Sequence, residues 1–222
     1  MSGAERLPGP ARCVCSTLGF EHPLWNAAYY PEQCPEEWHL AYFMNDFQAV
    51  YLQPAEWSER PGQVEALADE LEDDRFELVL EWPGLEHSSE IQQSLDLLEP
   101  LQGHIACLVL DTDVLSPDLL RQVYQGLEAR FPINLQGANL GALEGAAGCV
   151  WTPSREIDLS PAGNYQVVRI PCLGLREIKP VLQQLKPLLQ RGMRTGIFIE
   201  AHAQAPQRAL EVRTLIELME LA

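Results

Sequence analysis

The sequence is poor in positive charge. Of its 222 residues only 15 are Lys or Arg, against 32 Asp and Glu, so the formal net charge is −17. Only two of the basic residues, Lys179 and Lys186, are lysines. A surface this acidic repels phosphate backbones and anionic lipid, so we expect neither nucleic acid nor a membrane as a partner.

Long apolar runs are absent as well. No segment approaches the roughly 18 apolar residues of a membrane span, and residues 1–11 hold two prolines but no apolar core of a signal peptide. We therefore expect a cytoplasmic protein in which residues 1–11 form a flexible tail. The six cysteines lie mostly inside predicted strands, which favours reduced and buried thiols.

Several motifs of catalysis and cofactor binding are missing. Cys13 and Cys15 form a C-x-C pair without a second pair at zinc spacing, so no metal site is predicted. Residues 137–141 contain two glycines but lack the full dinucleotide-binding pattern and its strand–helix context. No Ser/His/Asp order or zinc-protease motif occurs either, and the cofactor, if any, is unknown.

What the sequence does contain is a repeated alternation of apolar runs and helix-like segments. Each run is five to eight residues long, and none alternates cleanly between apolar and polar, which is typical of strands covered on both faces. The predicted strands are residues 12–17, 49–54, 76–82, 104–111, 132–136, 148–152, 165–171 and 195–201. Strands separated by helices favour parallel pairing through crossover connections.

The segments between these runs carry helical periodicity and capping residues. Ser116 followed by Pro117, for example, predicts the start of a helix that continues over residues 119–130. Further helices are predicted over residues 36–46, 62–73, 89–101, 175–191 and 206–221, with a short one over 140–146. Residues 154–164 hold two prolines among loop residues, so the sixth crossover helix should be short or absent.

Eight such units in 222 residues match the size of one α/β barrel domain. The sequence therefore predicts a compact TIM-type (β/α)8 barrel that spans residues 1–222 as a single domain.

Several segments, in chain order, resemble those of one family. They are the stretch Ser16-Thr17-Leu18-Gly19-Phe20-Glu21-His22-Pro23-Leu24-Trp25, then Tyr29-Tyr30-Pro31, residues 40–43, 47–50 and 76–83, the strand 165–170 with Arg169, and residues 198–209. The chain is similar in these segments to the domain-of-unknown-function 72 (YecE-like) family. The resemblance implies a TIM-type barrel. It implies no activity, because the role of the family is itself unsettled.

The chain departs from the family pattern where strands end. Glu81 stands where the family has a lysine, Asn134 and Gln136 replace a Glu-x-Arg, and Glu200 begins the segment that replaces an Asn-Asn pair. The family residues that clearly survive are Thr17, Gly19, Trp25 and Arg169. Since barrel function is located at the carboxyl ends of strands, a ligand or chemistry typical of the family is altered or lost here.

Polar side chains nevertheless follow most of the predicted strands. The candidates for a ligand pocket are Thr17, Gln53, Glu81, Asp111, Arg169, Glu200 and His202, with Glu56 and Asp113 nearby. Carboxylates and a histidine at one mouth can hold Mg²⁺ or Mn²⁺ or act as acid and base, and they can equally cap and turn the strand ends. A buried arginine needs an anionic partner, so an internal ion pair from Arg169 to Glu81 or Glu200 is expected.

Four tryptophans, Trp25, Trp57, Trp82 and Trp151, follow or close predicted strands. Packing at the strand ends is the preferred interpretation, and a stacking surface for a sugar or heterocycle is the alternative.

Three functions remain open from the sequence. The preferred one is an uncharacterised protein of the YecE-like family whose altered strand-end site binds a small polar ligand or nothing. The alternatives are a metal-assisted hydrolase or isomerase that uses the carboxylates, and a non-catalytic scaffold for a protein partner. Whether the protein is an enzyme, and its oligomeric state, stay undetermined.

Overall fold

The computed structural model describes residues 13–26, 28–59, 62–71, 75–85, 87–143, 147–154, 164–190 and 193–221. The expected tail, residues 1–11, and most of the sixth connection, residues 155–163, lie outside this part of the chain. No helix in the described ranges is both long and apolar enough to cross a membrane.

The predicted strands are confirmed in number and position. They are β1 (Cys13–Thr17), β2 (Ala49–Leu52), β3 (Glu77–Glu81), β4 (Ile105–Asp111), β5 (Ile133–Gln136), β6 (Gly148–Cys149), β7 (Tyr165–Ile170) and β8 (Arg194–Ile199). All strand pairs are parallel. β6 is much shorter than the run that predicted it, because only Gly148 and Cys149 pair with β5.

The helices follow the predicted alternation. They are α1 (His39–Asp46), α2 (Pro54–Trp57), α3 (Gln63–Glu70), α4 (Glu90–Leu97), α5 (Pro117–Leu127), α6 (Leu175–Leu189) and α7 (Ala205–Leu218), with 3₁₀ turns η1 (Glu36–Trp38), η2 (Glu99–Leu101) and η3 (Leu140–Leu143). The predicted cap of α5 is confirmed, because the Ser116 side chain accepts a hydrogen bond from the Leu119 N–H. The four-residue α2 was not predicted.

The prediction of a closed TIM-type (β/α)8 barrel is wrong. The strands form two parallel sheets, one of three strands in the order β1-β8-β7 and one of five in the order β2-β3-β4-β5-β6. Among the described residues the sheets meet at two places, here called the β1–β2 seam and the β6–β7 seam, and each seam has one isolated bridge. The bridges join Leu18 to Tyr51 and Trp151 to Val168. A two-residue β6 is too short to form a regular ladder with β7.

Side chains make hydrogen bonds across both seams that a longer ladder would otherwise supply. At the β1–β2 seam the Ser16 hydroxyl donates to the Ala49 carbonyl at 2.5 Å. At the β6–β7 seam the fully buried Asn134 of β5 reaches the backbone of β7 directly. Its side-chain nitrogen donates to the Tyr165 carbonyl at 3.0 Å, and its oxygen accepts from the Val167 N–H at 3.3 Å. One buried amide therefore ties the two sheets together.

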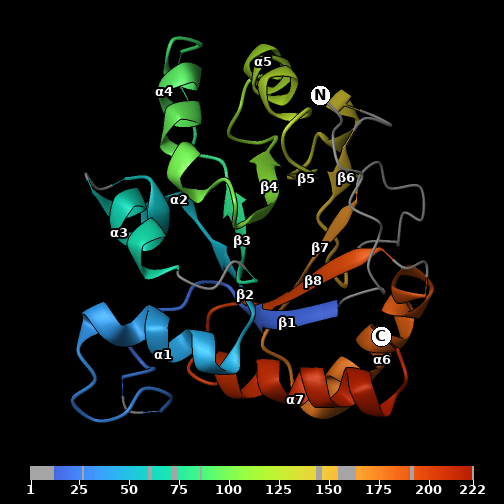
Figure 1. The fold of residues 1–222 in the computed structure, drawn as a ribbon. Coiled ribbons are helices and arrows are strands. Elements are labelled where there is room, and N and C mark those ends of the chain that lie inside the picture. Colours follow the sequence, from blue (N-terminus) through green and yellow to red (C-terminus); the bar gives the residue numbers. More distant parts are fainter. Residues whose placement is uncertain are drawn as a thin grey trace, which may run out of the picture.

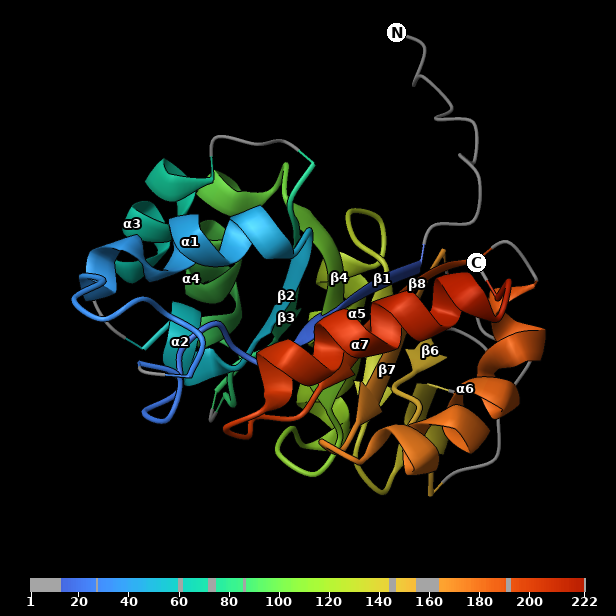
Figure 2. The same ribbon diagram turned by 90° about the horizontal axis from the view of Figure 1, so that it is seen from below.

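Two apolar clusters account for the core. The inner cluster takes alternate residues from strands of both sheets, including Val14, Ala49, Tyr51, Val79, Val109, Val167 and Phe198. The outer cluster joins the opposite strand faces to the helices, which lie around the outside of the strands (Figure 1). α7 packs on β1 and β8, with α6 beside it (Figure 2). The strand ends are thus held on a rigid framework.

Candidate ligand site at the strand ends

The carboxyl ends of strands from both sheets surround a small hollow, here called the strand-end cleft. It has a volume of about 300 Å³ and is lined by Asp111, Gln136, Gly137, Val150, Thr152, Arg169 and Glu200. Parallel strands bring their carboxyl ends to one side of a sheet, which is why residues distant in sequence meet here. Three of the predicted site residues, Asp111, Arg169 and Glu200, lie together in this cleft.

Arg169 lies at the centre of the polar contacts. One terminal nitrogen, Nη1, donates to Gln136 Oε1 at 3.0 Å, and the other, Nη2, lies 3.7 Å from Glu200 Oε1. The guanidinium carbon is 5.6 Å from the centre of the Tyr51 ring, a cation–π distance. Its Nε atom is buried and makes no hydrogen bond with the described residues. The guanidinium therefore retains donor capacity.

The neighbouring side chains form a connected network. Gln136 donates to Asp111 Oδ2 at 3.1 Å, so the amide connects that carboxylate to Arg169. The Tyr51 hydroxyl donates to Glu81 Oε2 at 2.7 Å. Burial and the Glu81 carboxylate raise the pKa of Tyr51 well above its ordinary value, so this phenol stays a proton donor. Of the two expected partners of Arg169, Glu200 is the one within ion-pair distance, and Glu81 is held by Tyr51.

Four predicted site residues do not line this cleft, namely Glu81, Thr17, Gln53 and His202. Thr17 is buried and its hydroxyl donates to the Gly19 carbonyl at 2.6 Å. Gln53 caps α2, where its backbone N–H donates to Glu56. His202 is exposed, and its ring nitrogen Nδ1 accepts from the Gln204 N–H. Each of these polar groups has a local structural partner.

The nearby Asp113 likewise orders a turn, because its carboxylate accepts from the Ala138 N–H at 2.9 Å.

The residues that resemble the family include several with structural roles. Gly19 has a φ of +72°, which favours glycine, and a Cβ there would collide with the Glu56 carboxylate. Trp25 is fully buried and donates to the His202 carbonyl at 2.8 Å. Arg169 is the surviving residue that faces the cleft.

The four tryptophans named above are all buried, with at most 4% of their surface exposed. The packing interpretation is therefore confirmed, and none of them offers a face on which a sugar could stack.

Sequence reasoning did not expect Tyr51 at this site, because an aromatic residue inside an apolar strand reads as core. The alternation of side chains between the two faces of β2 and β3 could have indicated this contact, because it places Tyr51 and Glu81 on the same inner face. Within the described ranges, no three His, Cys, Asp or Glu side chains are grouped so that they could hold a metal ion.

The fold and the site together define an α/β protein of two parallel sheets with a polar cleft at the strand ends. No family model matches the sequence, and no curated protein matches it either. Solved structures do. A domain-of-unknown-function 72 (DUF72) family protein from Thermotoga maritima superimposes with a TM-score of 0.72 and 15% identity, covering 92% of this chain and 99% of that one.

A second DUF72 family protein, from Enterococcus faecalis, has a TM-score of 0.63 and 13% identity, covering 95% of this chain and 99% of that one. These structures confirm, at the level of the fold, the family resemblance predicted from the sequence.

Proposed function

We propose that the protein is a divergent, cytoplasmic relative of the DUF72 (YecE-like) family that binds a small polar molecule in the strand-end cleft. The observation that carries this proposal is the position of Arg169, which lines the cleft together with Asp111 and Glu200 and whose buried Nε makes no hydrogen bond with the described residues. A volume of about 300 Å³ is at the lower end of small-molecule sites.

The charges of the cleft define the class of ligand. Arg169 offers donors to a carboxylate, and the oxygens of Asp111 and Glu200 offer acceptors to ammonium or hydroxyl groups. A small zwitterion or hydroxy acid satisfies both requirements, whereas a simple anion would be repelled by the carboxylates of Asp111 and Glu200. No observation on the described residues favours the metal-assisted hydrolase or the scaffold.

The test is a binding titration with a panel of amino acids and small hydroxy acids, followed by the variant Arg169→Met. We expect binding of at least one member at one site per chain, weakened roughly tenfold or more in the variant because a charged hydrogen bond is lost. Arg121→Met is the matched control, since Arg121 is exposed on α5 and pairs only locally with Asp118.

Two results would refute the proposal. One is that no member of the panel binds, and the other is that Arg169→Met binds as tightly as the unmodified protein. Unfolding in urea separates the structural role, because the half-exposed pair with Glu200 should contribute only about 1 kcal/mol. A loss of several kcal/mol without any effect on binding would identify Arg169 as a purely structural residue.

A further inference from the structure

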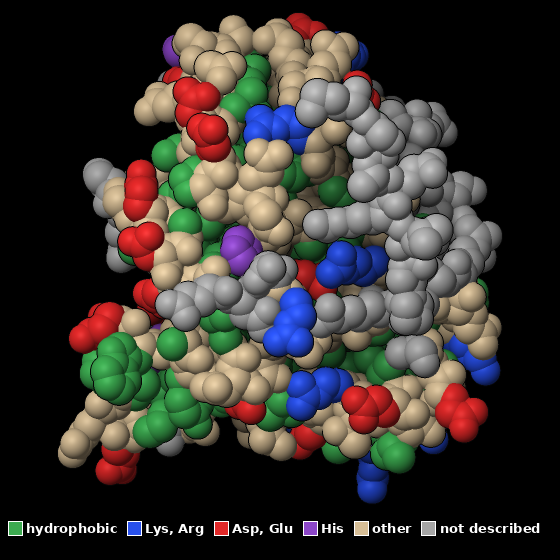
Figure 3. All heavy atoms as spheres, viewed as in Figure 1, with side chains coloured by type: hydrophobic (Ala, Val, Ile, Leu, Met, Phe, Trp, Pro, Cys, Tyr) green, Lys and Arg blue, Asp and Glu red, His purple; other side chains and the backbone are tan. Residues whose placement is uncertain are grey.

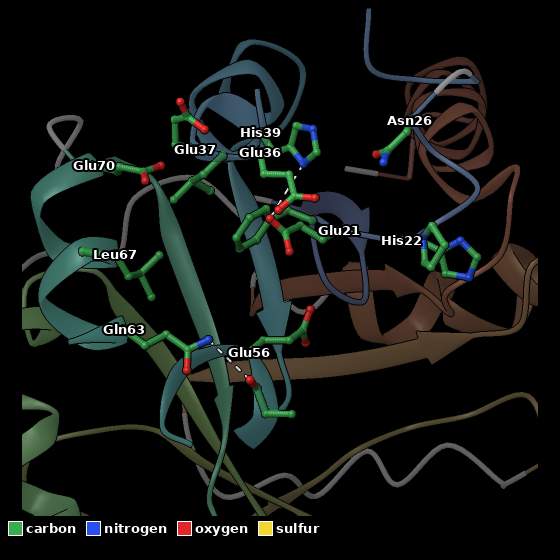
Figure 4. A pocket seen from close by; sticks show the side chains of 15 residues that line it. Glu21, His22, Asn26, Glu36, Glu37, His39, Glu56, Gln63, Leu67 and Glu70 are labelled. Atoms are coloured by element: carbon green, nitrogen blue, oxygen red, sulfur yellow. Dashed lines mark hydrogen bonds and ion pairs between the residues drawn. The ribbon is translucent and has the colours of Figure 1, made fainter. Parts of the chain in front are cut away.

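A second hollow, larger than the strand-end cleft, lies on the outer side of the strands and is here called the acidic cleft. Its volume is about 790 Å³, and its walls come from the loop after β1, from η1 and the start of α1, and from α2 and α3 (Figure 4). Five of its lining residues are glutamates, namely Glu21, Glu36, Glu37, Glu56 and Glu70. None of the described residues that line it is Lys or Arg.

His39 is a second, independent polar feature of this cleft. This histidine of α1 is almost fully buried, since only 3% of the residue is exposed. The ring stacks on Tyr30 at a centroid distance of 4.0 Å, which fixes its orientation. His39 lines the cleft, and its buried Nδ1 atom makes no hydrogen bond to any described residue, although Glu21 Oε1 lies at an ion-pair distance of 3.7 Å. Buried polar atoms normally have a hydrogen-bond partner, so this nitrogen can form a hydrogen bond with a molecule bound in the cleft.

No lysine or arginine among the described lining residues compensates the carboxylates of the cleft. Burial, together with the negative charges of Glu21 and Glu81, raises the pKa of Glu56 to about 7, against the hydrogen bond from the Gln53 N–H. Burial and Glu21 also raise the pKa of Glu70. Both directions mean that the cleft disfavours the negative charges of these two carboxylates, which a bound cation would stabilise.

Apolar side chains also line the cleft. Leu40, Ala55 and Leu67 belong to three different helices and line it together with the acidic residues, and Figure 4 shows Leu67 between Gln63 and Glu70 on α3. The lining therefore combines anionic groups with apolar groups that can pack against methylene groups. A metal ion would leave most of a cavity of this size unfilled, and no three described His, Cys, Asp or Glu side chains converge as metal ligands.

We propose that the acidic cleft binds an organic cation in which two or more ammonium groups are separated by methylene chains, as in a di- or polyamine. The ammonium groups pair with Glu21 and Glu70, one of them donates to His39 Nδ1, and the methylenes cover Leu40 and Leu67. This site shares no lining residue with the strand-end cleft, so the two binding proposals stand or fall separately.

The experiment must distinguish this site from general attraction to a protein of net charge −17. Spermidine and putrescine are titrated calorimetrically into the full chain at about 0.15 M salt, where exposed charges are largely screened. The test variant is Glu21→Gln with Glu70→Gln. The control is Glu65→Gln with Glu99→Gln, which removes the same amount of charge at exposed positions outside the cleft.

We expect one spermidine per chain, bound roughly tenfold or more weakly by the Glu21/Glu70 variant and unchanged in the Glu65/Glu99 control. Equal weakening in both variants, weak binding at several sites, or no binding would overturn the proposal. So would stoichiometric binding of Mg²⁺ with no binding of spermidine. If the double variant unfolds, Glu70→Gln is compared with Glu65→Gln on the same helix, and equal affinities would again refute the site.

Discussion

Glu56 offers the sharpest test of the electrostatics of the structure. Burial and the negative charges of Glu21 and Glu81 raise the pKa of this carboxyl from its ordinary value of 4.5 to about 7. The hydrogen bond from the Gln53 N–H acts in the opposite direction and lowers the pKa. The folded state therefore binds the proton more tightly than the unfolded chain does. Ionisation of Glu56 consequently costs stability, and this cost is absent below pH 4.5 and complete above about pH 7.

The magnitude follows from the linkage between proton binding and folding. At about 1.4 kcal/mol for each tenfold change in proton affinity, the cost is at most about 3 kcal/mol at pH 8 and about 1 kcal/mol at pH 5. Glu56→Gln keeps the shape and retains an oxygen to accept the Gln53 N–H. We expect it to stabilise the protein by about 1–3 kcal/mol at pH 8, and by clearly less at pH 5.

Urea unfolding of both proteins at the two pH values measures this difference. Glu65→Gln is the control, because Glu65 is exposed on α3 and should have little effect at either pH. A variant whose stability relative to the unmodified protein does not change between pH 5 and pH 8 would show that Glu56 is not desolvated. If the variant is less stable than the unmodified protein at pH 8, ionised Glu56 stabilises the folded state and the prediction is refuted.

Three further predictions concern the interior. Asn134→Leu should lower the free energy of unfolding in urea by about 2–4 kcal/mol, because the Tyr165 carbonyl and the Val167 N–H lose their buried partner. An unchanged midpoint would show that the Asn134 amide does not stabilise the seam. Gly196→Ala should cost about 1–3 kcal/mol, since a Cβ there would lie 2.5 Å from the Tyr165 hydroxyl, and equal stability would show that the inner cluster can relax. In native alkylation followed by mass spectrometry, the partly exposed Cys34 should react well before Cys107, whose burial raises the pKa to about 12; the reverse order would contradict the burial of Cys107.

Local patterns predicted the elements well. The apolar runs located the strands, and Ser116 with Pro117 located the start of α5, because both signals depend on neighbouring residues. The closure of the strands into one barrel was predicted wrongly, because pairing between distant strands is not encoded by neighbouring residues. Pairing across the β6–β7 seam depends on how long β6 is in three dimensions, and the run that starts at Gly148 gives no sign that only two residues pair.

The sites were predictable only in part. Asp111, Arg169 and Glu200 follow parallel strands, so the common direction of the strands was enough to bring them together. The acidic cleft was not predicted, because Glu21, His39 and Glu70 come from a loop and two helices whose mutual packing no period in the sequence reveals. The buried position of His39 was also missed, since it depends on stacking against Tyr30.

The strand-end cleft lies across the β6–β7 seam, and this position has a mechanical consequence. Gln136 belongs to the five-stranded sheet, while Arg169 and Glu200 belong to or follow strands of the three-stranded sheet. A molecule that contacts all three acts as a non-covalent cross-link between two bodies otherwise joined there by one bridge and a few side chains. We therefore expect such a molecule to stiffen the seam and to slow hydrogen exchange at the Trp151 and Arg169 amides, which donate hydrogen bonds across it.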